Sequence, residues 1–264
     1  QLQIRFRQDG VLVNYQTLPL EMATPLATRL KVMGKIDIVE KRRHQDGRFT
    51  FQDHGLTADL RMSTYVSVHG ESIVLRLLSR HSHLLDIRQL GMGPRMLQGF
   101  MDGALEAPSG VVIITGPTGC GKTTTLYSCI NHVNRPNTSI ITAEDPVEYV
   151  VDGVTQCSIN ARIGLTYEDT LKHIVRQDPD VIVIGEIRDH ETAATAVRAA
   201  NSGHLVLATL HSPTASGAVH SMLALEAHPY FMSGCLLGVV AQRLVRTLCP
   251  KCRVEYDLSE SPQT

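Results

Sequence analysis

The sequence predicts an α/β protein whose parallel sheet is covered by helices, with a smaller α+β domain at its N-terminal end. Three observations carry this prediction. Before about residue 80, short strands of alternating apolar and polar residues are separated by turn residues, which indicates an antiparallel sheet. After about residue 84, continuous apolar strands alternate with helical patterns, which is typical of a parallel sheet covered on both faces. Within that second part, residues 111–130 contain a strand, a glycine-rich turn and a helix, in that order.

The first elements expected are a β-hairpin and a helix. Residues 2–6 and 11–15 alternate apolar and polar side chains on either side of Asp9-Gly10, which predicts two strands joined by a tight turn. Residues 20–33 carry apolar side chains at helical spacing, which predicts a helix with one buried face.

The rest of the small domain is predicted to be strands. They are expected at 48–52, 56–65 and 72–78, after turns at Gln45-Asp46-Gly47, His54-Gly55 and His69-Gly70. The polar segment Arg80–His83 ends the pattern and is the candidate linker. We therefore assign residues 1–88 to the N-terminal domain with its linker, and residues 89–264 to the larger domain.

The larger domain alternates strands with helices. Strands are expected at 111–115, 140–143, 181–184 and 205–209, and helices at 122–133, 170–177 and 192–200. Thr166, three residues before Asp169, resembles a helix cap, and Gly203 follows a helix end.

A phosphate-binding loop is the strongest motif. Gly116–Thr123 fits G-x-x-x-x-G-K-[ST] between a strand and a helix, the context that this loop requires, so a chance match in a Gly/Thr-rich loop is a poor explanation. Lys122 is expected to reach the β and γ phosphates and the Thr123 hydroxyl to bind Mg²⁺. The expected nucleotide-binding residues are Gly116, Pro117, Thr118, Gly119, Cys120, Gly121, Lys122, Thr123 and Thr124.

A carboxylate for hydrolysis is expected at the end of the strand 181–184. Many ATPases place Asp and then Glu there, but Gly185 occupies the Asp position, which leaves Glu186. We assign Glu186 to water activation, with part of the Mg²⁺ sphere. The alternative is an ordinary solvated loop glutamate.

A second acidic set, Glu144–Glu148, follows the strand 140–143. Pro146 stiffens this turn at the carboxyl edge of the sheet, where ligands bind in such folds. Glu148 is the candidate second carboxylate near Mg²⁺, although acidic turns are also common surface features.

His204 and His211 stand at either end of an apolar strand. A histidine at the ligand edge of a sheet senses a γ-phosphate or hydrogen-bonds a catalytic carboxylate, which is the role expected of His211. The alternative is a capping or core histidine, an interpretation that weighs equally for His204.

Two further pairs are candidates for binding. Cys249 and Cys252 have the spacing of half a zinc site, but four ligands are needed and no second pair follows, so two free cysteines are the alternative. Arg61 and Arg76 lie in alternating strands. Most such arginines are solvated, whereas ring ATPases use arginines from a neighbouring subunit to stabilise the transferring phosphoryl group, and both interpretations stay open.

Composition narrows the classes of function. With 264 residues and 43% apolar side chains the chain is long enough for two modest domains. The formal net charge of −1 is too small to attract the whole protein to nucleic acid or to an anionic membrane. Six cysteines without a framework argue for a reducing cytosol, and the absence of a long apolar run means that any membrane association goes through partners. The chain starts within a pattern, which suggests a piece of a longer protein.

Five long motifs resemble those of the secretion ATPase superfamily of type II secretion and type IV pilus assembly. They are GPTGCGKTTTLY, ITAEDPVEY, RQDPDVIVIGEIRD, SGHLVLATLHS and VAQRLVRTLCPKC. RFRQDG, QDGR and GESIVLRLL extend the resemblance to nearly the whole chain. The resemblance implies a RecA-like P-loop ATPase core and a PAS-like N-terminal domain. It implies ATP and Mg²⁺, with Zn²⁺ in the full-length protein, and a cytoplasmic homohexamer that acts on an inner-membrane platform protein.

The resemblance also implies roles for matching residues. Gly116–Thr123 resembles the Walker A loop, Glu144–Glu148 the Asp box, Asp180–Glu186 the Walker B motif with Glu186 catalytic, and Gly203–His211 the His box. Arg61 and Arg76 resemble the arginines that reach nucleotide across a subunit interface. Ser212-Pro213 stands where the family usually has Thr-Asn, but this departure leaves the loop and Glu186 intact, so activity is expected.

The function expected is therefore an ATP-hydrolysing motor for pilus assembly or type II secretion. The alternatives are a pilus-retraction ATPase, which the Cys249–Cys252 pair disfavours, and a nucleotide-dependent scaffold with negligible turnover, which Glu186 and Glu148 disfavour. A nucleic-acid motor is disfavoured by the near-neutral charge. In a single protomer we expect Lys122 and Glu186 close together and no arginine near them.

Overall fold

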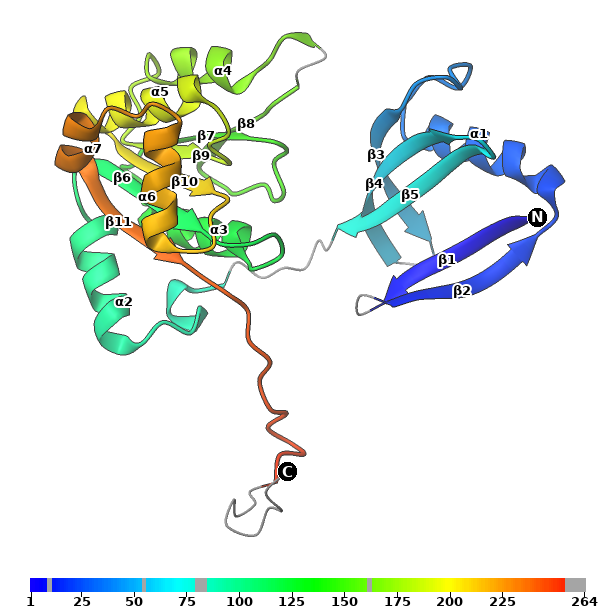
Figure 1. Cartoon of the computed structure of the whole chain (residues 1–264), viewed down its shortest axis with the longest axis horizontal. Helices are drawn as coiled ribbons and strands as arrows, with labels where there is room; N and C mark the ends of the chain where they lie inside the picture. Colours follow the sequence, from blue (N-terminus) through cyan, green and yellow to red (C-terminus); the bar gives the residue numbers. More distant parts are fainter. Residues whose placement is uncertain (9–10, 54–55, 79–84, 161–162, 255–264) are drawn as a thin grey trace. The chain divides into compact units, whose positions relative to one another are not determined.

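The structure is a computed structural model that describes residues 1–8, 11–53, 56–78, 85–160 and 163–254. The chain divides into two compact units, Gln1–Ser82 and His83–Thr264, and each is described by itself (Figure 1). The sequence interpretation placed the boundary a few residues later, after residue 88. The turns predicted at Asp9-Gly10 and His54-Gly55 and the candidate linker Arg80–His83 lie outside the described residues.

The first unit contains the predicted hairpin, a helix and an antiparallel sheet. Strands β1 (Leu2–Gln8) and β2 (Val11–Leu18) pair antiparallel, and a 3₁₀ turn (η1, Leu20–Met22) leads into α1 (Ala23–Met33). The other strands, β3 (Gln45–Asp53), β4 (Leu56–Ser67) and β5 (Gly70–Leu78), form a three-stranded sheet in that order.

The prediction of a turn at Gln45-Asp46-Gly47 is wrong, because these residues begin β3. Gln45 is buried, its backbone N–H donates to Thr64 Oγ1 at 3.0 Å, and its side-chain amide donates to the carbonyl of Asp37 at 2.9 Å. A Cβ at Gly47 would lie 2.5 Å from the carbonyl oxygen of Gly34. The glycine therefore marks a close approach between the strand and the end of α1, not a turn.

The second unit is built on a parallel sheet, as predicted, and this sheet has six strands. Its order is β11-β6-β10-β9-β7-β8, and its strands are β6 (Gly110–Thr115), β7 (Ile140–Glu144), β8 (Val154–Ser158), β9 (Val181–Ile184), β10 (Leu205–Leu210) and β11 (Leu236–Ala241). The sequence interpretation did not include β8 and β11. The helices and short turns are η2 (Ile87–Gln89), α2 (Pro94–Phe100), η3 (Met101–Leu105), α3 (Lys122–Val133), α4 (Tyr167–Ile174), α5 (His190–Asn201), α6 (Ala215–Ala224) and α7 (Pro229–Cys235).

Helices cover both faces of this sheet, because its strands alternate apolar side chains between two buried clusters. On one face, Val111 and Ile113 of β6 pack with residues of α4, α5, α6 and α7. On the other face, Val112 and Ile114 pack with α2, η3 and α3 (Figure 1). Thr166 caps α4 by accepting the N–H of Asp169 at 3.2 Å, so α4 starts earlier than residue 170. Among the described residues, none of the helices has the length and apolar character that a membrane crossing requires.

The strand order decides which loops meet. In a parallel sheet all carboxyl ends lie at one edge, where ligands bind. The neighbours β6, β10, β9 and β7 therefore bring the loops that follow Thr115, Leu210, Ile184 and Glu144 next to one another. These four loops carry the predicted phosphate loop, His211, Glu186 and the acidic turn.

Candidate active site

The loop between β6 and α3 has the backbone of a phosphate-binding loop. Gly116, Gly119 and Gly121 have φ values of 147°, 79° and 88°, in the region that favours glycine. A Cβ at Gly116 would lie 2.5 Å from the carbonyl oxygen of Gln242 and 2.6 Å from Cys120 Sγ, so only glycine fits. The loop leads directly into the N-terminus of α3, whose unpaired N–H groups favour an anion.

Lys122 lies folded against its own loop. Its side chain is largely buried, and Nζ donates to the carbonyl oxygens of Gly116 at 2.9 Å and Pro117 at 3.1 Å. Nζ also lies 3.2 Å from His211 Nδ1. Because an ammonium group only donates, His211 must accept at Nδ1 and carry its proton on Nε2.

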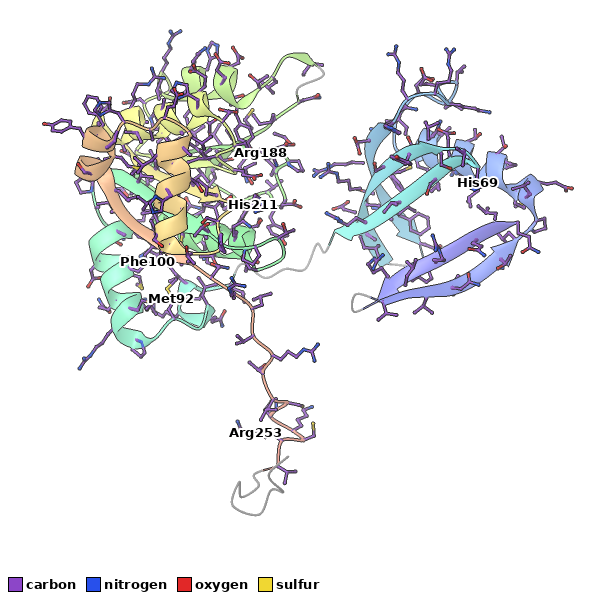
Figure 2. All side chains as sticks on the ribbon, in the orientation of Figure 1. His69, Met92, Phe100, Arg188, His211 and Arg253 are labelled. Atoms are coloured by element: carbon purple, nitrogen blue, oxygen red, sulfur yellow. The ribbon has the colours of Figure 1, made fainter. Side chains whose placement is uncertain are left out.

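Glu186 lies on the other side of the same histidine. His211 Nε2 is 3.0 Å from Glu186 Oε1, and Arg188 approaches Glu186 Oε2 through Nε at 2.7 Å and Nη2 at 2.5 Å. One part of the single-protomer expectation is thereby wrong, namely that no arginine lies near Lys122 and Glu186. His211 stands between Lys122 and Glu186, and an arginine does pair with Glu186. Figure 2 labels Arg188 and His211, which lie near each other in the second unit.

Packing explains why glycine occupies the position before Glu186. A Cβ at Gly185 would lie 3.0 Å from the Tyr167 hydroxyl and 3.1 Å from Glu144 Cα, so an aspartate would push on both neighbours. Thr209 fixes the backbone here: its hydroxyl donates to the Gly185 carbonyl at 2.5 Å, and its carbonyl accepts the N–H of Ile187 at 2.9 Å. Glu186 is therefore the carboxylate that β9 delivers to this edge.

The acidic turn contains one buried, structural carboxylate and other carboxylates that are exposed. Glu144 is 3% exposed, and its carboxylate accepts hydrogen bonds from Tyr127 Oη at 2.5 Å, Thr142 Oγ1 at 2.6 Å and Gln156 Nε2 at 3.1 Å. Burial, and then the Glu144 contact, raises the pKa of Tyr127, which keeps its hydroxyl a donor. Glu148 is exposed and faces the cleft described below. Glu148, unlike Glu144, is thus available to a ligand.

Replacing Tyr127 with phenylalanine is expected to lower the free energy of unfolding of the second unit by about 1–3 kcal/mol, because the buried Glu144 carboxylate loses a donor. Tyr149→Phe is the matched control. The Tyr149 ring packs edge-on against Tyr127, but the hydroxyls that bind Glu144 are those of Tyr127 and Thr142. Urea unfolding compares the two variants. Equal losses in both would contradict a structural role for the Tyr127–Glu144 contact.

These groups line one cleft of about 480 Å³. Its walls come from the phosphate loop, the acidic turn and the ends of β9 and β10, and they include Thr118, Gly119, Gly121, Lys122, Thr123, Thr124, Glu148, Glu186 and His211. The volume lies in the usual range for small-molecule sites. Tyr167 also faces the cleft, and burial, followed by the nearby Asp145 charge, raises the pKa of its hydroxyl. The glycine cradle, the helix N-terminus and the polar lining fit a nucleoside triphosphate with Mg²⁺.

The sequence interpretation missed Gln242, which clasps the phosphate loop from the segment after β11. Its side chain donates to the Cys120 carbonyl at 2.7 Å and accepts from Thr125 Oγ1 at 2.8 Å. Its backbone N–H donates to the Thr115 carbonyl at 3.0 Å. The VAQRLV motif contains this residue, but only the sheet order, which places β11 beside β6, indicates what it touches.

The remaining candidates lie elsewhere. Arg61 and Arg76 are directly opposite each other on β4 and β5 of the first unit, and Arg48 on β3 is opposite Arg61 on the other side. The three arginines therefore lie in register across the three strands of this sheet. His204 Nδ1 is 2.8 Å from the Pro179 carbonyl, in keeping with a structural role.

The cysteine pair does not make a metal site on its own. Cys249 and Cys252 are exposed, and the described residues contain no group of three or more His, Cys, Asp or Glu side chains that could hold a metal ion. Structural zinc needs four ligands. Among the described residues, Cys249 and Cys252 therefore lack the further ligands that a Zn²⁺ site requires.

Comparisons with known proteins identify the family of this chain. The family model "Type II/IV secretion system protein" matches residues 1–263. The chain is 45% identical over 260 residues to "Type II secretion system protein E" of Pseudomonas aeruginosa, covering 98% of this chain and 52% of that protein. It is 46% identical over 256 residues to "Type II secretion system ATPase E" of Vibrio cholerae, covering 97% and 51%. The chain thus spans about half the length of the curated relatives it matches.

Solved structures confirm the predicted fold class. The crystal structure of the pilus retraction motor PilT with bound ADP matches with a TM-score of 0.67 at 29% identity, covering 89% of this chain and 69% of that one. The ATPase DotB of Yersinia pseudotuberculosis matches with a TM-score of 0.68 at 22% identity, covering 90% and 67%. The second likeness concerns the fold alone.

Proposed function

Because the chain belongs to the type II/IV secretion system protein family, we propose that it is a secretion-motor ATPase that hydrolyses ATP to ADP and phosphate in the cleft between the phosphate loop and Glu186. The observation that carries the proposal is the chain of contacts from Lys122 through His211 to Glu186. It places the expected phosphate-binding lysine and the expected water-activating carboxylate on either side of one histidine. A relative named as an ATPase and a solved structural neighbour with bound ADP support the choice of nucleotide.

The proposed mechanism assigns a task to each cleft residue. The backbone N–H groups of the phosphate loop and Lys122 hold the phosphates, with Thr124 at the start of α3 completing the loop. Thr123, with Glu186 and Glu148 nearby, would hold Mg²⁺, which neutralises charge on the phosphates. Glu186 orients the attacking water, and His211, whose Nε2 lies 3.0 Å from Glu186 Oε1, keeps that oxygen in place.

The assembly is part of the same proposal. We place the chain in a cytoplasmic homohexamer, peripheral to the inner membrane, that works on a platform protein of the secretion machine. Arg61 and Arg76 of an adjacent subunit would stabilise the phosphoryl group in transfer. The names of the relatives favour type II secretion over pilus assembly, and the likeness to PilT keeps retraction as the alternative. A scaffold with negligible turnover is the other alternative.

Steady-state ATPase activity against protein concentration tests this proposal. Specific activity is expected to rise with concentration, because each site needs an arginine from another subunit. Arg61→Ala should lower the turnover of the concentrated protein at least about 100-fold, the scale of an arginine supplied in trans. Arg29→Ala, an exposed arginine on α1 of the same unit, is the control and should leave the rate unchanged.

Three outcomes would contradict parts of the proposal. Concentration-independent turnover that survives Arg61→Ala would remove the arginine roles but keep the ATPase. Tight ATP binding without turnover at any concentration would favour the scaffold. A failure to bind ATP at all would overturn the assignment of the cleft.

A further inference from the structure

Both carboxylate oxygens of Glu186 have a protein nitrogen within 3.0 Å. Arg188 donates a hydrogen bond from Nε to Oε2 at 2.7 Å, its Nη2 forms an ion pair with the same oxygen at 2.5 Å, and His211 Nε2 is 3.0 Å from Oε1. The Glu186 side chain is only 15% exposed, so little of it remains for water to approach.

The arginine that holds Glu186 has a second acceptor within reach. Arg188 Nη1 is 3.3 Å from Asp145 Oδ2 on the acidic turn, and the Arg188 side chain is 55% exposed. The side chain can therefore leave Glu186 and remain paired. The backbone need not move, because Thr209 fixes Gly185 and Ile187 on either side of Glu186.

The lysine side of the cleft is engaged in the same way. The three donors of the Lys122 ammonium have three acceptors, namely the carbonyls of Gly116 and Pro117 and Nδ1 of His211. Phosphate oxygens that take up Lys122 would compete with His211 for one of these hydrogen bonds. Because the same imidazole also contacts Glu186, a change in the Lys122–His211 contact would alter the His211–Glu186 contact. Phosphate binding is thereby connected to the contact between Glu186 and Arg188.

We propose that Arg188 is an inhibitory latch: it holds Glu186 in a non-catalytic arrangement, and hydrolysis requires the Arg188 side chain to move from Glu186 onto Asp145. Arg188 is thus a regulatory positioning residue that acts through Glu186 and does not touch substrate. The inference rests on the proposed ATPase function, since it concerns the rate at which the same site turns over.

Replacing Arg188 with glutamine in the full 264-residue chain tests the latch. The kcat for ATP should rise about fivefold, the rate equivalent of a partly exposed ion pair worth about 1 kcal/mol. KM for ATP and the Kd of MgATP should stay within about twofold, because Arg188 does not bind the phosphates. Arg188→Lys keeps the charge but not the two-pronged contact, so its kcat should lie between wild type and Arg188→Gln.

Arg135→Gln is the matched control. It removes another arginine–glutamate pair of the same unit, that with Glu106, and neither residue lines the cleft. Its kcat should equal that of wild type. A thermal unfolding scan of each variant ensures that a changed rate is not a loss of fold.

The results separate the latch from the proposed function. If wild type hydrolyses ATP and the kcat of Arg188→Gln is equal to or below that of wild type, the latch is overturned but the ATPase function is not. If the kcat of Arg188→Gln falls as far as that of Glu186→Gln, Arg188 is necessary for the reaction. A gain in kcat matched by Arg135→Gln would also overturn it. No ATP turnover in wild type or any variant would overturn the proposed function, and the latch would fall with it.

Discussion

Replacing Lys122 with alanine is expected to raise the Kd of MgATP at least about 100-fold, because charge-assisted hydrogen bonds from an ammonium to phosphate contribute about 3 kcal/mol. The loop would also lose the donor shared by the Gly116 and Pro117 carbonyls and His211. Equilibrium titration with a fluorescent ATP analogue measures the effect, and turnover should disappear with binding.

Lys172→Ala is the matched control for this experiment. Lys172 is an exposed lysine on α4 whose ammonium group pairs with the surface carboxylate of Glu168 at 2.5 Å. Its removal should leave MgATP affinity unchanged. Wild-type affinity in Lys122→Ala would show that nucleotide binds elsewhere and would remove the phosphate loop from the account.

Replacing Glu186 with glutamine should separate binding from chemistry. The substitution keeps the size of the side chain but removes the basic oxygen, so turnover should fall about 100- to 1000-fold, in the range of a lost general base. MgATP affinity should stay within about threefold, because Lys122 and the loop are untouched. Phosphate release in steady state and the binding titration measure the two quantities on one sample.

Glu168→Gln, which removes a surface glutamate of the same unit, should change neither quantity. The assignment of Glu186 fails if its glutamine variant retains more than about a tenth of wild-type turnover. In that case the exposed Glu148 of the acidic turn would be the next carboxylate to test.

Sequence alone predicted the phosphate loop and the order of the elements around it, because these are local properties. The glycines at 116 and 121, the buried strand before them and the helix after them all lie within the single segment 110–133. The periodicity of buried strands likewise predicted the parallel sheet. Two strands were missed: β8 is a polar edge strand, and β11 follows directly on a short helix whose apolar residues merge with its own.

The contacts within the site depend on packing that periodicity does not reveal. A Cβ at Gly185 would lie 3.0 Å from the hydroxyl of Tyr167, which comes from the start of α4. The Arg188 side chain turns back and binds Glu186. The spacing of two residues in the sequence does not predict this contact. In the first unit, the buried face of α1 contains Lys31, which is 1% exposed and pairs with Glu71 at 2.6 Å, where an apolar residue is the usual expectation.

A single-turnover measurement tests the central claim most directly. Excess protein, wild type or Glu186→Gln, is mixed with a small amount of ATP labelled on the γ-phosphate in the presence of Mg²⁺, and bound ATP and released phosphate are followed in time. The account predicts that wild type converts the bound ATP to ADP and phosphate, whereas Glu186→Gln binds the same amount and keeps it intact at least about 100 times longer. Conversion at equal rates in the two proteins, or no conversion by wild type despite full binding, would contradict it.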